Sequence, residues 1–308
     1  MDDRHRAALN RLRGLLASRA ARVLGTLLAV GLVALLLVRL GQLWSEHPVP
    51  LDEANWPLVA LALAVSGAAM TAYGAVWPTT FRALGAEPPA GLLAAFYAGQ
   101  LAKYLPGGAW QYVGRAALAA RLGVPLRVGA GSLGLEAISS LVAAALVAPF
   151  VLATGAAWGA AAAAIALLGL AAAELAARLP IMRRMVVDLG ALRSATARYL
   201  LVWIVFGAAF WLTAAALYSV SISQSPLYTG VFAAAWASGF VVVFAPGGLG
   251  VREAVIVALL RGRLGESEAI VLAAASRIAF TLVDLAGGAA ALATLRRTPS
   301  AQREKARF

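Results

Sequence analysis

The tetrapeptides Leu105-Pro106-Gly107-Gly108 and Ala245-Pro246-Gly247-Gly248 interrupt two apolar stretches of this chain, 140 residues apart. Each break is followed closely by charged side chains, Arg115 after the first and Arg252 with Glu253 after the second. Irregular backbone and charge are both costly in hydrocarbon, so at membrane depth they persist where protein buries them or where they line a wet cavity. Broken hydrophobic segments in matching positions of two halves are typical of a transporter's binding site. We therefore predict a membrane transporter.

Composition agrees with a membrane protein. Hydrophobic residues make up 62% and charged residues 13% of the 308 residues, and the mean hydropathy is +0.82, whereas a soluble domain carries about 25% charged residues. The net charge is +12, and the basic residues cluster at the N-terminus, between Arg178 and Arg198, and at the C-terminus, each beside a long apolar run. This positive-inside pattern indicates anionic membrane lipid as the partner and argues against nucleic acid. The chain has no cysteine, which excludes disulfides and thiol chemistry.

Stretches of about 20 apolar residues are long enough to cross a bilayer as helices. Because six are present, we expect an all-α polytopic membrane protein with about six transmembrane helices: Val23–Leu43, Pro57–Trp77, Val128–Leu152, Trp158–Ala176, Tyr199–Val220 and Ala269–Leu295. Two further pairs of apolar segments are too short to cross singly, and each pair meets at its Pro-Gly-Gly break. These pairs predict two broken, re-entrant helical hairpins, Gly91–Leu105 with Ala109–Leu122 and Tyr228–Ala245 with Leu249–Leu260.

Charge then predicts the orientation of these segments. The basic N-terminus (1–22) and the tail (296–308) are expected on the cytoplasmic side of the cell membrane, on either side of a transmembrane domain over 23–295. The first hairpin is then expected to enter from the cytoplasm and the second from outside. Units of about 57–152 and 199–295 would have opposite orientations and form an inverted repeat. A second hairpin that spans fully stays an alternative, because Arg261 and Arg263 would otherwise lie outside.

A new helix is expected to begin after each break. Proline suits the first turn of a helix, and glycine leaves backbone N–H groups accessible. The positive end of each half-helix is a site for an anion such as phosphate. We predict that Pro106, Gly107 and Gly108, and likewise Pro246, Gly247 and Gly248, hold a lipid phosphate with help from Lys103, Arg115 and Arg252. The alternative for Lys103 and Arg115 is that they extend to the membrane interface.

Further ionisable residues lie within the predicted membrane segments: Glu136, Glu253, Arg277 and Asp284. Unpaired, each would cost several kcal/mol in hydrocarbon, so we expect each to have a partner. Arg277 and Asp284 are seven residues apart and share one helix face. The carboxylates are expected to pair with the arginines or to receive a cationic headgroup, and structural ion pairs are the alternative. No metal-ligand spacing and no catalytic set accompany them, so we expect neither a cofactor nor an enzyme.

Three segments follow one another in the chain: Lys103-Tyr-Leu-Pro-Gly-Gly-Ala-Trp-Gln-Tyr-Val-Gly-Arg115, then Glu136, then Pro246-Gly-Gly-Leu-Gly-Val-Arg-Glu253 with Arg277 behind it. They resemble the flippase-like membrane region of lysylphosphatidylglycerol synthases, a family with stand-alone YbhN-type members, over most of the chain. Many members carry Pro-Gly-Arg-x-Gly-Glu at the first break, where this chain has Pro106-Gly107-Gly108-Ala109-Trp110-Gln111. The resemblance implies movement of an aminoacylated, otherwise anionic or polyprenyl-linked lipid between leaflets.

The leading hypothesis is therefore a lipid flippase-like transporter. A hypothesis from another class is a non-transporting membrane scaffold that partners a glycosyltransferase or a lipid synthase. An integral-membrane enzyme is disfavoured, because no catalytic set is recognisable.

Overall fold

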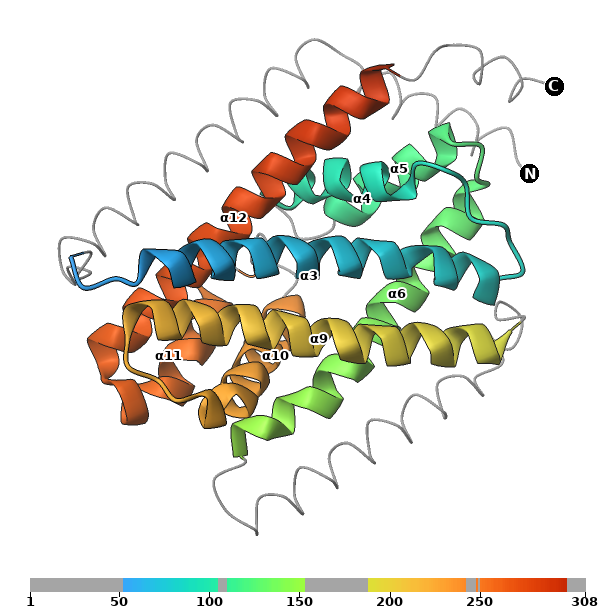
Figure 1. The fold of residues 1–308 in the computed structure, drawn as a ribbon. Helices are drawn as coiled ribbons and strands as arrows, with labels where there is room; N and C mark the ends of the chain where they lie inside the picture. The colour runs from blue at the N-terminus through green and yellow to red at the C-terminus, as the bar shows by residue number, and fades with distance from the viewer. Residues whose placement is uncertain (1–51, 105–109, 153–187, 242–247, 249, 298–308) are drawn as a thin grey trace.

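The computed structural model describes residues 52–104, 110–152, 188–241, 248 and 250–297, which form helices and their connections without a β-strand (Figure 1). Two of the predicted spans, Val23–Leu43 and Trp158–Ala176, lie outside these residues, as does the N-terminal segment 1–22. The described helices are α3 (Trp56–Ala83), α4 (Leu92–Gln100), η1 (Leu101–Tyr104), α5 (Trp110–Arg121), α6 (Leu126–Val147), η2 (Ala148–Leu152), α9 (Leu189–Leu217), η3 (Ile222–Gln224), α10 (Ser225–Val241), α11 (Val251–Leu264) and α12 (Glu266–Arg297).

Four of these helices are long and apolar enough to cross a membrane. They cover Trp56–Ala83, Leu126–Val151, Leu189–Leu217 and Glu266–Leu295. Each contains most of one predicted span, so the prediction of long apolar helices is confirmed for the four spans that the structure describes. A helix satisfies every backbone hydrogen bond within its own segment, which suits it to hydrocarbon. The described part of the chain is therefore that of an α-helical membrane protein.

Side chains at the helix ends explain where the long helices begin. Asn55 accepts a hydrogen bond from the Leu58 N–H (3.2 Å) at the start of α3, and Asp188 accepts one from the Ala191 N–H (3.0 Å) at the start of α9. Such caps satisfy N–H groups that have no partner within the helix. Because Asp188 caps α9, the helix begins at Leu189 and not at the predicted Tyr199. The first turn of α12 contains Glu266 and Glu268, whose charge suits the positive end of a helix.

The predicted short helices on either side of each break are also present. In the first hairpin, α4 has 9 residues and α5 has 12, and in the second, α10 has 17 and α11 has 14. Each is shorter than the roughly 20 residues that a bilayer requires. Of the break residues, Pro106, Gly107, Gly108, Pro246 and Gly247 lie outside the described residues. Gly248 is described, and its φ of 70° is a left-handed conformation that glycine adopts readily.

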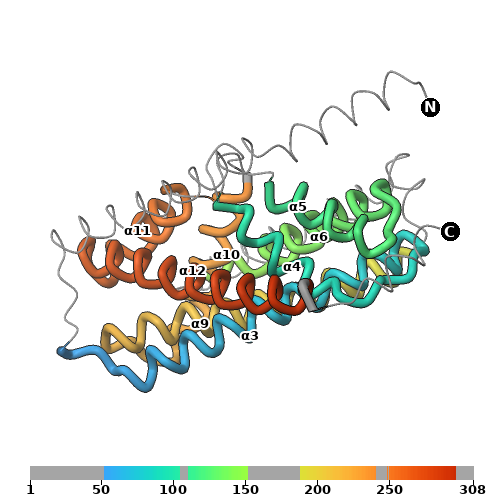
Figure 2. The backbone as a smooth tube through the Cα atoms, turned by 90° about the horizontal axis from the view of Figure 1, so that it is seen from above, coloured from blue at the N-terminus to red at the C-terminus, as the bar shows by residue number. Residues whose placement is uncertain are grey.

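The helices follow one another in the same order twice. We call α3–α6 the first unit and α9–α12 the second unit. The long helices α3 and α9 lie side by side and run in opposite directions (Figures 1 and 2). The Asn55 N–H donates to the Ala216 carbonyl (2.8 Å) and the Asp188 N–H to the Ala83 carbonyl (3.2 Å), so the start of each helix meets the end of the other.

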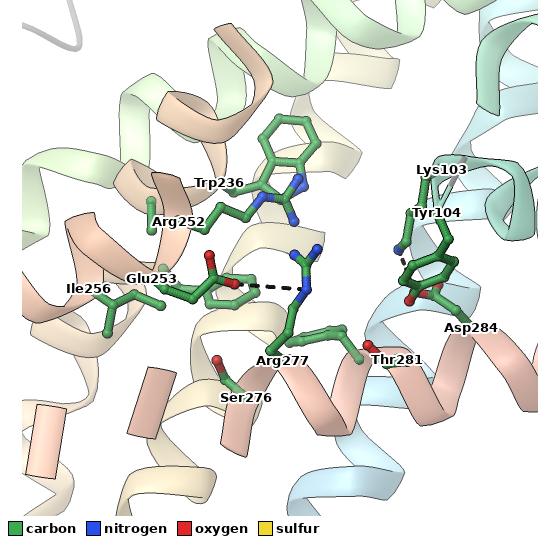
Figure 3. A pocket seen from close by; sticks show the side chains of 13 residues that line it. Lys103, Tyr104, Trp236, Arg252, Glu253, Ile256, Ser276, Arg277, Thr281 and Asp284 are labelled. Carbon is green, nitrogen blue, oxygen red and sulfur yellow. Dashed lines mark hydrogen bonds and ion pairs between the residues drawn. The ribbon is translucent and has the colours of Figure 1, made fainter. Parts of the chain in front are cut away.

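The two units also meet where α12 of the second packs on α4 of the first. Neither Gly287 nor Gly288 has room for a Cβ atom, because Tyr97 and Leu101 lie against them. This close approach places Lys103, which follows α4, next to Asp284 of α12 (Figure 3). Elsewhere, the fully buried Trp203 of α9 donates from its indole nitrogen to the Ser140 carbonyl of α6 (3.1 Å). The packing therefore joins the residues just before the first break to the last long helix.

Gly230 offers a direct test of this packing. A Cβ atom at Gly230 of α10 would overlap the backbone of Phe150 and Val151, which cannot move aside as a flexible side chain could. We expect Gly230→Ala to lower the free energy of unfolding by about 1–3 kcal/mol. Gly262→Ala in α11 is the matched control, since nothing lies within 4 Å of the added carbon. Thermal unfolding of the two purified variants in detergent measures the difference, and equal melting temperatures would contradict the packing of α10 on η2.

Candidate functional site

An open cavity lies between η1 of the first unit and α10, α11 and α12 of the second (Figure 3). Five of the predicted site residues line the cavity: Lys103, Arg252, Glu253, Arg277 and Asp284. The structure therefore brings together charged side chains that lie far apart in the sequence.

Asp284 of α12 forms one side of the cavity with two residues of η1. Lys103 forms an ion pair with Asp284, and the Tyr104 hydroxyl donates a hydrogen bond to Asp284 Oδ2 (2.8 Å). Asp284 is fully buried, so the two partners supply the neutralisation that its charge requires at this depth. Its second oxygen, Oδ1, has no hydrogen-bond partner among the described residues. The pair also fixes the residues just before the first break to the last long helix.

Glu253 of α11 contacts both the start of its own helix and Arg277 of α12. Its Oε2 accepts a hydrogen bond from the Gly250 N–H (2.8 Å), and its Oε1 lies 3.8 Å from Arg277 Nε. The sequence predicted that amide groups at the start of this half-helix would face a lipid phosphate. The Gly250 N–H at this end faces a carboxylate of the chain itself, which suits the positive helix end. Glu253 therefore holds the start of α11 and positions Arg277 at the cavity.

Arg252 differs from the other charged residues of the cavity. Its aliphatic chain lies against Gly239 and Gly248, where a Cβ atom at either position would collide with it. Its guanidinium lies 5.6 Å from the ring centre of Trp236. The described residues give Arg252 neither a hydrogen bond nor a carboxylate within ion-pair distance, and its Nε is buried. In Figure 3 its guanidinium and that of Arg277 extend toward each other.

The cavity thus carries an excess of positive charge. Its described lining has three cations, Lys103, Arg252 and Arg277, and two carboxylates, Glu253 and Asp284, for a net charge of +1. The undescribed residues of the two breaks, 105–109, 242–247 and 249, contain no ionisable side chain. Each carboxylate has a cation beside it, which leaves Arg252 as the cation that a ligand could neutralise.

The predicted residues Arg115 and Glu136 do not line this cavity. They pair with each other between α5 and α6, through Nη1 to Oε1 (2.7 Å) and through Nη2 to Oε2, and both are buried, at 2% and 1% exposure. The Arg115 guanidinium also lies 4.2 Å from the ring centre of Trp77 and 4.8 Å from that of Phe96. Such a closed, bidentate pair has the geometry of a structural ion pair.

Sequence analysis did not single out Trp236 as a site residue. Aromatic residues are frequent in membrane segments, so Trp236 carried no distinctive signal. The sequence does carry a signal for Arg115 and Arg252, however, in the position of two glycines. Gly99 and Gly239 each lie seven residues before the proline of their break, and each gives room to an arginine of the following half-helix, Arg115 or Arg252.

Similarity to known proteins was sought at the level of sequence and of structure. No protein-family model, no curated protein and no solved structure matches this chain. The family resemblance of the break motifs therefore stays a prediction. What the chain does has to be argued from the cavity and its charges.

The Arg115–Glu136 pair makes a prediction about stability. Glu136→Gln leaves the Arg115 charge buried without its counter-charge, so we expect a loss of about 3–5 kcal/mol in the free energy of unfolding. Replacing both partners by apolar residues, Arg115→Met with Glu136→Leu, should cost less than the single change. Unfolding of both variants in detergent, followed by circular dichroism, gives the comparison. A double variant that is less stable than the single one would contradict the structural role.

Proposed function

We propose that this chain is a flippase-like transporter, which moves the headgroup of an anionic lipid between leaflets by way of the cavity. The observation that carries the proposal is Arg252, a cation on the cavity wall to which the described residues offer no carboxylate. A charge at membrane depth is costly unless it is neutralised. A lipid phosphate would neutralise Arg252 and gain a charge-assisted hydrogen bond in return.

The cavity also has the surroundings that a lipid headgroup needs. It is lined by η1 of the first unit and by helices of the second, and the described long helices have the apolar lengths of membrane spans. The break motifs resemble those of a lipid-moving family, which supports a lipid as the cargo, whether anionic, aminoacylated or polyprenyl-linked. In this proposal Arg252 and Arg277 receive the headgroup, while Glu253 and Asp284 hold the surrounding cations in place.

We further propose that the second hairpin is re-entrant. The Tyr218 hydroxyl, just after α9, donates to the Glu268 carbonyl near the start of α12 (3.2 Å). The chain therefore leaves α9 and enters α12 at the same end, which supports a course in which α10 and α11 return to the side from which they came. In the first hairpin, Gly91 before α4 likewise lies against Leu122 after α5. Because α3 and α9 run in opposite directions, the hairpins would enter from opposite sides of the membrane.

Matching details in the two units support an inverted repeat. In each unit the long helix has a glycine against a residue of the next helix 22 positions later, Gly74 with Phe96 and Gly207 with Thr229. Gly99 with Arg115 and Gly239 with Arg252 form a second matching pair of contacts. With inverted units, alternating access would proceed by rocking one unit against the other around the cavity. The Lys103–Asp284 pair, which joins the units, would re-form on each cycle.

Transport depends on Arg252 in this proposal. In proteoliposomes of the cell membrane's lipids with a labelled anionic lipid, we expect Arg252→Gln to lower the rate of headgroup translocation by about tenfold or more, since a hydrogen bond to a charged group is worth at least about 1.5 kcal/mol. The matched control is Arg261→Gln, which removes an exposed arginine from the same helix. Reduction of the label in the outer leaflet by dithionite measures the rate.

Equal rates of headgroup translocation in the wild type and in Arg252→Gln would contradict the transport mechanism and favour the scaffold function. The scaffold would then be expected to co-purify with a glycosyltransferase or a lipid synthase. Loss of transport in both arginine variants would show only that the overall charge of the chain matters. The proposal therefore depends on the difference between the two variants.

The proposed topology has a separate test, which the absence of native cysteine makes simple. Single cysteines are introduced at exposed positions: Ser223 and Glu266 on either side of the second hairpin, and Glu87 and Arg127 on either side of the first. We expect an impermeant thiol reagent to label Ser223→Cys and Glu266→Cys from one side, outside the cell, and Glu87→Cys and Arg127→Cys from the cytoplasmic side. Labelling of Ser223→Cys and Glu266→Cys from opposite sides would mean that the second hairpin spans the membrane.

A further inference from the structure

The charges of the cavity set a condition on its ligand. The two carboxylates are each engaged by the chain: Asp284 by Lys103 and Tyr104, and Glu253 by Arg277 and by the Gly250 N–H. The three cations exceed them by one. In an environment of low dielectric constant, an uncompensated charge is costly in either sign. A ligand with one negative charge brings the lining to zero, whereas a ligand with none, or with two or more, leaves a net charge behind.

The position of Arg252 sets a second condition, on the arrangement of the oxygen atoms of the ligand. Arg252 is confined by Gly239 and Gly248 and lies near the Trp236 ring, so its guanidinium has a restricted set of positions. A guanidinium recognises two oxygens of one phosphate through parallel hydrogen bonds. A phosphodiester has two unsubstituted oxygens and a single negative charge. A phosphomonoester carries about −1.5 to −2 at pH 7, and a diphosphate carries still more.

We infer that the cavity selects a singly charged phosphodiester, in preference to a zwitterionic headgroup, to a phosphomonoester or to a diphosphate-linked carrier. The inference rests on the proposed function in taking the ligand to be a membrane lipid. It goes further by assigning the selectivity to the charge difference between three cations and two carboxylates. Among the lipids that the proposed function leaves open, it favours a simple anionic phospholipid over a polyprenyl diphosphate.

The test measures binding, not transport. The full chain in detergent is mixed with equal amounts of phosphatidylglycerol, phosphatidylethanolamine and phosphatidic acid that share the same acyl chains, and the bound lipids are counted by native mass spectrometry. We expect the wild type to bind phosphatidylglycerol about tenfold or more over each of the other two. Arg252→Gln, which lowers the net charge of the lining to zero, should turn the preference from phosphatidylglycerol to the net-neutral phosphatidylethanolamine.

Two variants shift the charge in the other direction. Glu253→Gln and Asp284→Asn each raise the net charge of the lining from +1 to +2, so each should turn the preference toward phosphatidic acid. The amide introduced by Glu253→Gln keeps an oxygen that can accept from the Gly250 N–H. This variant therefore keeps the start of α11 intact even if the buried Asp284→Asn variant fails to fold. The matched control is Glu266→Gln, which removes an exposed carboxylate outside the cavity and should leave the preference unchanged.

Equal binding of the three lipids by the wild type, or a Glu253→Gln variant with the wild-type preference, would overturn the inference. A second arm separates the lipid from a soluble source of the same chemistry. Glycerophosphoglycerol or inorganic phosphate that displaces phosphatidylglycerol at equal concentration would overturn the assignment to a lipid. Charge-selective binding in a protein whose Arg252→Gln variant still transports lipid would refute the transport mechanism and leave the selectivity of the cavity standing.

Discussion

An ionised side chain is stable inside an apolar medium only when neighbouring protein groups neutralise it. This constraint accounts for most of what is unusual in the described structure. Three buried or half-buried ion pairs, Arg115–Glu136, Lys103–Asp284 and Glu253–Arg277, each join a residue near a break to a long helix. The described residues beside the breaks are therefore held in place by charge as well as by packing. Glu253 shows both effects, because it caps its own half-helix and pairs with the next one.

The polarity of the pairs differs between the two units. In the first, the arginine belongs to the half-helix and the carboxylate to the following long helix. In the second, the half-helix supplies Glu253 and the long helix supplies Arg277. This reversal leaves Arg252, which lies against Gly239 as Arg115 lies against Gly99, without the carboxylate that Arg115 has. One arginine is thus part of the framework, and its counterpart lines the cavity. Two similarly built units can in this way contribute unequally to a single site.

The helices could be predicted from the sequence, but the contacts between them could not. Four long helices and both pairs of short ones follow from the length of each apolar run and from the breaks, which are local properties. The predicted apolar span begins at Tyr199, whereas α9 already begins at Leu189, directly after its cap at Asp188. The sequence indicates that each charged residue in a membrane segment needs a partner, but it does not indicate which residue that partner is. Nothing near Asp284 in the sequence indicates Lys103, since the two meet only when α12 packs on α4 through Gly287 and Gly288.

The contact of a glycine with an arginine in each hairpin has a consequence for how the sequence can change over generations. A larger residue at Gly239 would collide with Arg252, and an equivalent change at Gly99 would collide with Arg115. Each glycine is therefore expected to change only where its arginine has also been replaced by a smaller residue. No such constraint links the glycine of one hairpin to the arginine of the other. Relatives of this chain can then change the arginine and glycine of one hairpin while the other hairpin keeps its original pair.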